Sequence, residues 1–278
     1  MPSHAAGRKY NRGLLLREKR TLLQRPWIIA TVTLAVLIVV NHDHEILSSF
    51  SAYRDLHRTH PFYFVESLDK IGGVMMCCLA VWLMRRTGLR GICRELGLSN
   101  ITVTATAFGV GVSLPMLLGF AITRDLSPHL DALALLFLTV FSPVVEEIEF
   151  RGFGVRQLQR GTGWPFWAVV WLSAILFGYG HVEQGQSWME MAGLFLLTGT
   201  GGVVFAWLVY RWQTLWVAVA LHICMNLWWE LFSVSKSAVG GWFPFLLQTF
   251  TFILAILGTL RFTHSEVGAS RALVENRV

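Results

Sequence analysis

Residues 132–160 read ALALLFLTVFSPVVEEIEFRGFGVRQLQR, and this stretch decides the fold. An uncharged apolar run leads directly into three carboxylates and an arginine. Pro143 loosens a helix, because its ring clashes with a backbone carbonyl one turn earlier, but the chain beyond Glu146 keeps helical spacing. We therefore predict one long, kinked helix. If Arg156 and Arg160 mark the membrane interface, Glu146 lies about 15–21 Å below it at 1.5 Å per residue.

The composition of the whole chain points to a membrane protein. Hydrophobic residues make up 54% of its 278 residues and charged residues 14%, whereas soluble domains carry about 25% charge. Long uncharged runs exclude an ordinary cytosolic enzyme, a disordered chain and a nucleic-acid-binding domain as a class. The net charge of +6 is interpreted as a topology signal, because the basic residues cluster between apolar runs.

Hydropathy predicts an all-α fold, a polytopic transmembrane helical bundle of about eight helices with an intramembrane polar cavity. The first two spans are short, because crossing a bilayer takes about 20 residues. The first could extend back over Leu22 and Leu23, and the second could begin near Phe62. The predicted spans are 27–40, 71–84, 101–122, the kinked helix from 132, 164–180, 191–210, 212–229 and 241–260.

The basic residues also predict the orientation. Most of the 23 Lys and Arg residues fall in segments that eight spans place on the side of the N-terminus, so both termini are expected to be cytoplasmic. We expect a basic segment over 1–25, a transmembrane domain over 26–261 and a tail over 262–278, in a multi-pass protein of a bacterial inner membrane. The basic residues expected on the other side are Arg54, Arg58, Lys70, Arg124 and Lys236.

Three polar groups interrupt the apolar runs, and ionisable groups deep in a membrane are functional candidates by default. They are the run from Glu146 to Arg151, the run from Phe177 to His181, and the pair His222 and Asn226. From the ends of their spans, His181 lies about 25 Å deep, His222 about 15 Å and Asn226 about 21 Å. The groups therefore share one slab of the bilayer, and Phe177, on the same helix face as His181, can wall the site.

Spacing within each motif assigns side chains to faces. Glu147 and Arg151 are four residues apart with the acid first, which favours an intrahelical ion pair. Glu146 is turned about 100° from Glu147 and is free to face a cavity. His222 and Asn226 are also four residues apart and share one face of their helix.

In this order on separate helices, Glu-Glu-x-x-x-Arg, Phe-x-x-x-His and His-x-x-x-Asn resemble the CPBP family. This group of CAAX prenyl endopeptidases and bacteriocin-processing or self-immunity proteins is also called the Abi family. The resemblance covers residues 142–226 in detail and implies an intramembrane endopeptidase. It implies that Glu146 and His181 activate water and that His222 and Asn226 stabilise the oxyanion.

The resemblance gives Glu147 and Arg151 a supporting role. Glu149 departs from the family pattern, which more often has an apolar residue there. A third carboxylate so close to Glu146 would repel its negative charge.

Several alternatives stay open at the level of sequence. Glu146, His181 and His222 could ligate zinc, since two histidines and one carboxylate form a catalytic set, but a metal-free mechanism uses the same residues. The substrate could be a prenylated CAAX tail, a peptide precursor or another membrane protein. A catalytically silent scaffold or immunity protein of the same fold is the first alternative function. A proton-relay transporter is the second, although we see no inverted repeats.

Other polar groups receive simpler interpretations. The run from His42 to Glu45 fits no specific metal site and is predicted to be a solvated loop, as are His57 and His60. The four cysteines lack metal-ligand spacing and are interpreted as buried free thiols.

Overall fold

The computed structural model of the chain describes residues 22–99, 101–127, 131–236 and 238–275, and these contain helices and no strand. Two shorter apolar helices, α2 (Pro26–Asn41) and α13 (Trp216–Leu231), accompany five segments that are long and apolar enough to cross a membrane. The all-α polytopic bundle is therefore confirmed. The five segments are α5 (Phe62–Arg85), α7 (Val103–Thr123), α11 with η4 (Phe166–Tyr179 and Val182–Gln184), α12 (Trp188–Trp212) and the first part of α14 (Trp242–Glu275).

The predicted kinked helix is present as one nearly continuous helical path, and it does not stop at the glutamates. It changes winding twice, with π-helical turns in η2 and η3. The first change comes directly before Pro143, where the wider turn accommodates the ring. Its parts are α8 (Ala132–Leu136), η2 (Phe137–Phe141), α9 (Ser142–Glu146), η3 (Glu147–Val155) and α10 (Arg156–Thr162).

The chain between the first and second spans differs from the prediction. It forms two short helices, α3 (Asp43–Ser48) and α4 (Ser51–Thr59), so the predicted solvated loop is wrong there. α5 then starts after Pro61, which makes the earlier of the two predicted starts correct. The charges in the first turns of α5 lower its local hydropathy, which is why a start at residue 71 was expected. Lys70 accordingly lies within a membrane-length helix.

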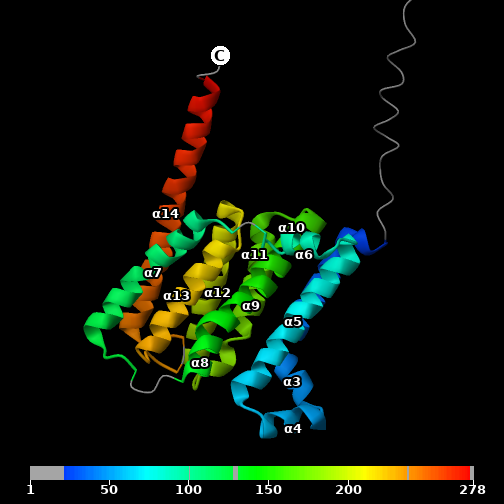
Figure 1. The fold of residues 1–278 in the computed structure, drawn as a ribbon, viewed down its shortest axis with the longest axis vertical. Coiled ribbons are helices and arrows are strands. Elements are labelled where there is room, and N and C mark those ends of the chain that lie inside the picture. Colours follow the sequence, from blue (N-terminus) through cyan, green and yellow to red (C-terminus); the bar gives the residue numbers. More distant parts are fainter. Residues whose placement is uncertain (1–21, 100, 128–130, 237, 276–278) are drawn as a thin grey trace, which may run out of the picture.

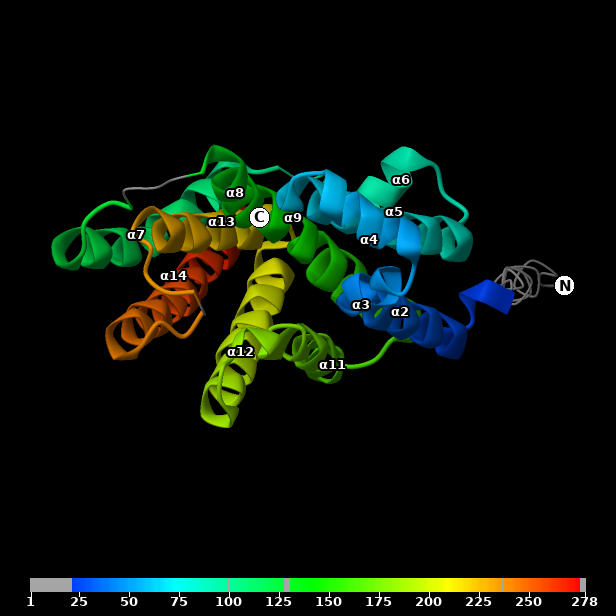
Figure 2. The same ribbon diagram turned by 90° about the horizontal axis from the view of Figure 1, so that it is seen from below.

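The buried helix η3 lies at the centre of the bundle. All nine of its residues are buried. It contacts α2 and α5 on one side and α11 and α12 on another, while the adjoining α9 contacts α5 and α13 (Figure 2). The glutamates at the junction of α9 and η3 are therefore surrounded by helices from both halves of the chain.

The two ends of the bundle carry different short helices. α6 (Leu89–Glu95) and α10 lie at one end, and α3 and α4 lie at the other (Figure 1). At the first end, Glu95 is 3.8 Å from Arg85 and 3.5 Å from Arg160. The expected cytoplasmic orientation of this end stays a prediction.

The predicted terminal segments are only partly described. Most of the basic segment 1–25 falls on residues 1–21, outside the described residues. α14 continues to Glu275, so most of the expected tail over 262–278 is helical, and its assignment as a cytoplasmic tail stays a prediction. The four cysteines are free, as predicted. Cys77 and Cys224 are buried, but Cys78 and Cys93 are only half-buried.

Close packing of α7 on α13 gives a first prediction. A Cβ on Gly109 would lie 2.8 Å from the backbone oxygen of Val217 and 2.9 Å from the backbone nitrogen of Leu221. We expect Gly109→Ala to lower the free energy of unfolding by about 1–3 kcal/mol, because two helix backbones must move apart. Gly111→Ala is the control, since its Cβ would meet nothing within 4 Å. Unfolding in detergent measures both, and equal stability of the two variants would contradict the close approach.

Candidate active site

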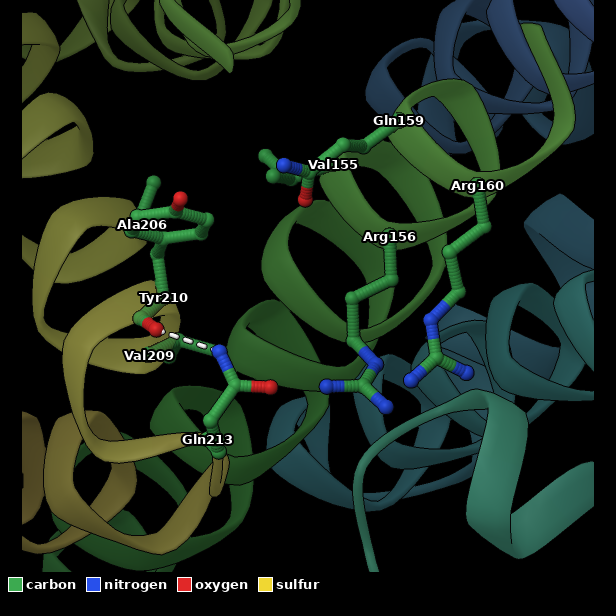
Figure 3. Close-up of a pocket in the computed structure, with 8 residues that line it drawn as sticks. All are labelled: Val155, Arg156, Gln159, Arg160, Ala206, Val209, Tyr210 and Gln213. Carbon is green, nitrogen blue, oxygen red and sulfur yellow. Dashed lines mark hydrogen bonds between the residues drawn. The ribbon is translucent and has the colours of Figure 1, made fainter. Parts of the chain in front are cut away.

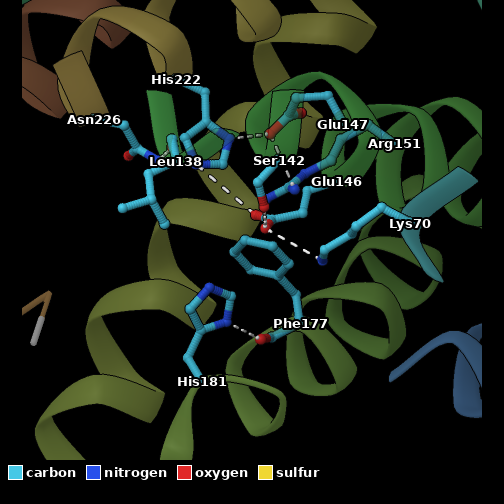
Figure 4. Close-up of polar contacts among 10 residues, drawn as sticks. All are labelled: Lys70, Leu138, Ser142, Glu146, Glu147, Arg151, Phe177, His181, His222 and Asn226. Atoms are coloured by element: carbon cyan, nitrogen blue, oxygen red, sulfur yellow. Dashed lines mark hydrogen bonds and ion pairs between the residues drawn. The ribbon is translucent and has the colours of Figure 1, made fainter. Parts of the chain in front are cut away.

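The Glu146 carboxylate lies beside His222, in a cluster of side chains from separate helices (Figure 4). Its Oε2 is 4.0 Å from Nε2 of His222, too far for a hydrogen bond. Ser142, one turn earlier, donates a hydrogen bond of 2.6 Å to Oε1. The Lys70 ammonium on α5 is 3.7 Å from the same oxygen. Glu146 is therefore held by a hydroxyl and a cation, and its second oxygen faces the imidazole.

The neighbouring Glu147 carboxylate is fully buried and joins two helices. Its Oε1 is 3.1 Å from Nη1 of Arg151, so the predicted intrahelical ion pair is confirmed. The same oxygen is 2.9 Å from Nδ1 of His222 on α13. Because an ionised carboxylate only accepts hydrogen bonds, Nδ1 carries the hydrogen and Nε2 is directed toward Glu146.

Aromatic rings cover the Arg151 guanidinium. Its central carbon lies 4.3 Å from the ring centroid of Phe177 and 5.3 Å from that of Phe205. The His222 ring stacks on Phe205 with centroids 5.2 Å apart. The side chain of Arg151 is 1% exposed, so a single carboxylate and these ring faces replace the water around its charge.

His181 follows α11 and approaches the cluster from the side of Phe177. Its Nδ1 donates to the Phe177 carbonyl at 2.8 Å, and the two rings are 4.6 Å apart. The carbonyl can only accept, so the neutral His181 ring keeps a free lone pair on Nε2. His181 also lies within electrostatic range of Glu146.

Asn226 has a contact that its motif did not predict. Its amide donates to the Leu138 carbonyl at 3.0 Å. In the π-helical turn, the Ser142 N–H donates to the carbonyl of Phe137, five residues earlier. In the same pattern, the N–H of residue 143 would donate to the Leu138 carbonyl. Proline has no N–H, and Asn226 supplies the missing donor. One amide hydrogen of Asn226 thus supports the kink.

Sequence reasoning missed Lys70 and Ser142. Lys70 follows Glu66 by four residues and Asp69 by one, inside a helix that is otherwise apolar. A helix that begins at Phe62 contains Glu66, Asp69 and Lys70, and ionisable residues within a membrane-length helix are functional candidates. Ser142 is four residues before Glu146 and shares its face of α9.

The structure places Glu149 at the edge of the cluster. Its carboxylate is buried, and neither oxygen has a hydrogen-bond partner among the described residues. It lies against Gly73, where any Cβ would collide with Oε1. Lys70 is within electrostatic range of both Glu146 and Glu149, so it offsets the repulsion expected between the two carboxylates.

The three candidate zinc ligands do not form one coordination set in the described part of the chain. Glu146, His181 and His222 do not bring a ligand atom each within 4.8 Å of one another. We therefore assign their chemistry without a step through a metal.

A cavity of about 180 Å³ lies elsewhere, between α10 and α12 (Figure 3). None of the predicted site residues lines it, and the polar cavity expected around Glu146 stays a prediction. The lining residues are Val155, Arg156, Gln159, Arg160, Ala206, Val209, Tyr210 and Gln213.

Comparison with known proteins gives one family match for part of the chain. Residues 128–228 match the family model described as Type II CAAX prenyl endopeptidase Rce1-like. The match supports membership of the CPBP family for this segment. The matched CPBP segment contains the kinked helix and both histidines of the cluster. No curated protein and no solved structure matched the chain.

The buried ion pair gives a second prediction. Arg151→Ala leaves the Glu147 carboxylate buried beside an uncharged residue, so we expect about 3–5 kcal/mol loss in the free energy of unfolding. Arg58→Ala is the control, because Arg58 is 77% exposed and pairs with Asp55 at 3.6 Å. Exposed pairs contribute about 0–1 kcal/mol. Thermal unfolding in detergent measures both, and a stable Arg151→Ala protein without activity would instead make Arg151 part of the chemistry.

Proposed function

We propose that the chain is an active intramembrane endopeptidase in which Glu146 activates a water molecule for attack on a peptide bond. The observation that carries the proposal is the placement of the Glu146 carboxylate. One oxygen is held by Ser142 and Lys70, and the other is 4.0 Å from Nε2 of His222. A separation of this size can be bridged by one water oxygen that hydrogen-bonds to both groups.

The proposed chemistry begins with proton transfer from water to Glu146. The resulting hydroxide attacks the peptide carbonyl carbon and gives a tetrahedral oxyanion, whose collapse re-forms the C=O bond and breaks the C–N bond. His181 presents an Nε2 lone pair within electrostatic range of Glu146, and it shares the proton that must reach the leaving amine. Glu146 and His181 together thus supply the base and the acid of hydrolysis.

We assign oxyanion stabilisation to His222 and Asn226. Nε2 of His222 can donate to the oxyanion when the ring carries both protons, because Nδ1 is already engaged by Glu147. Asn226 has one amide hydrogen beyond the one it gives to Leu138. Fixed donors of this kind act most strongly where water is excluded, and His222 is 9% exposed.

The proposed substrate is a peptide or protein segment that reaches the site from the lipid phase. The large exposed apolar surface and the membrane-length helices fit a lipid environment, and the family match fits a CAAX-type peptide. We keep the prenylated and unprenylated forms as two arms of the assay. The orientation with cytoplasmic termini and the bacterial inner membrane stay part of this proposal.

The third prediction tests the base. Glu146→Gln keeps the shape of the side chain but cannot accept a proton, so cleavage in proteoliposomes should fall by about 100-fold or more. Glu183→Gln is the matched control, because Glu183 is an exposed carboxylate two residues after His181. The assay uses a farnesylated CAAX peptide and its unprenylated form.

Two results would count against this mechanism. Retention of more than about a tenth of the activity by Glu146→Gln would remove Glu146 from the role of base. A folded wild-type protein that cleaves neither peptide would favour the catalytically silent scaffold.

The fourth prediction tests the shared oxyanion contact. His222→Ala and Asn226→Ala should each slow turnover, each donor being worth about 3 kcal/mol, and the double variant should lose clearly less than the sum. Thermal unfolding of each variant controls for the support that Asn226 gives to the kink. Additive losses in kcat among equally stable variants would show that the two side chains do not act on one oxygen.

A further inference from the structure

A second polar cluster lies where α3 and α4 meet the first turns of α5. His44 comes from α3, His57 from α4, and Glu66 and Asp69 from one face of α5. One ligand atom from each of the four lies within 4.8 Å of the others. The cluster is outside the matched segment 128–228 and shares no residue with the Glu146 site.

The distances from Glu66 to the two histidines are longer than those of normal hydrogen bonds. Oε1 of Glu66 is 3.5 Å from Nδ1 of His44 and 3.8 Å from Nε2 of His57. Both Oε1 of Glu66 and Nε2 of His57 are buried, and neither has a hydrogen-bond partner in the described part of the chain. Zinc–ligand bonds of about 2.0–2.2 Å in a tetrahedral site place neighbouring ligand atoms about 3.3–3.6 Å apart. The observed separations are near that spacing.

Tyr53 orients two of these side chains. Its hydroxyl donates to Oδ2 of Asp69, and its ring packs edge-on against His57 with centroids 4.6 Å apart. The hydroxyl also lies 3.2 Å from Nδ1 of His44, a contact that a metal bond would replace. A fixed outer partner of this kind is typical of metal-binding carboxylates and histidines.

The nearby cations make their direct contacts with groups outside the cluster, and Lys70 also lies within electrostatic range of Glu66. Arg54 donates to the backbone carbonyls of Ser48 and Ser49, at 2.7 and 2.9 Å. Arg58 pairs with the exposed Asp55, and Lys70 pairs with Glu146. Two carboxylates and two neutral imidazoles carry a charge of about −2, which one divalent cation neutralises. Imidazole ligands favour zinc over magnesium or calcium.

We propose that His44, His57, Glu66 and Asp69 bind one zinc ion at a site separate from the peptidase centre. The ion fastens α3 and α4 to the start of α5. Asp69 directly precedes Lys70, the residue that contacts Glu146, so the same helix serves both sites. His44 is half-exposed, with 53% of its side chain accessible, and this opening is the route by which the ion enters.

The test measures zinc on the untagged full-length protein in detergent, stripped with a chelator and dialysed against zinc. We expect about one zinc per chain in the wild type. The ratio should fall at least about tenfold in His57→Ala and Glu66→Gln, and Tyr53→Phe should weaken binding about 10–100-fold. His60→Ala is the matched control: His60 is exposed, close in sequence and outside the cluster, and it should keep the zinc. X-ray absorption of the wild type should show two imidazole ligands.

Other outcomes overturn the proposal. Zinc that stays in His57→Ala and Glu66→Gln but is lost in Glu146→Gln would belong to the peptidase centre. A wild-type protein with a cooperative thermal transition and no bound zinc would exclude the site. If the variants do not fold, cobalt titration of the stripped wild type decides: a tetrahedral absorption band supports the site, and its absence contradicts it. None of these readouts depends on peptidase activity.

Discussion

The Glu147 carboxylate, shared between Arg151 and His222, is the interaction on which the rest of the site depends. A buried carboxylate is costly unless it is paired and hydrogen-bonded, and one oxygen here meets both requirements. It fixes the register of η3 against α13, and it sets which nitrogen of His222 carries a hydrogen. The remaining nitrogen then faces Glu146, so a contact that stabilises the bundle also aims the imidazole. The CPBP motif Glu-Glu-x-x-x-Arg thus combines one glutamate for the proposed chemistry with one for the fold.

The interrupted helix makes this arrangement possible. Pro143 removes a backbone donor, and the preceding π-helical turn would leave the Leu138 carbonyl without a partner in the membrane. Asn226 fills that position from α13. Since unsatisfied backbone groups are expensive in lipid, this single bond ties the kink to the same helix that carries His222. The kinked helix and the polar site therefore depend on each other, because Asn226, which bonds the Leu138 carbonyl, is one helical turn from His222.

Much of the site could be predicted from sequence because its signal is local. The spacing of Glu147 and Arg151 predicted their pair, and the helical spacing of the chain after Glu146 predicted that the kinked helix continues past the glutamates. The failures concern contacts between segments far apart in sequence. The sequence predicts Lys70 outside the membrane, because charged residues lower the hydropathy of the first turns of α5. His44 and His57 were interpreted as a loop because no motif spacing predicts that two short helices fold back onto Glu66 and Asp69.

Glu147 couples η3 to α13 through His222. A double-mutant cycle on the free energy of unfolding tests it directly, with Glu147→Gln, His222→Ala and the double variant measured in detergent. We expect a coupling energy of about 1 kcal/mol or more, because a hydrogen bond to a buried charge exceeds the average of about 0.6 kcal/mol for polar contacts between membrane helices. Additivity of the two single losses to within about 0.3–0.5 kcal/mol would contradict it, since that is the behaviour of independent residues.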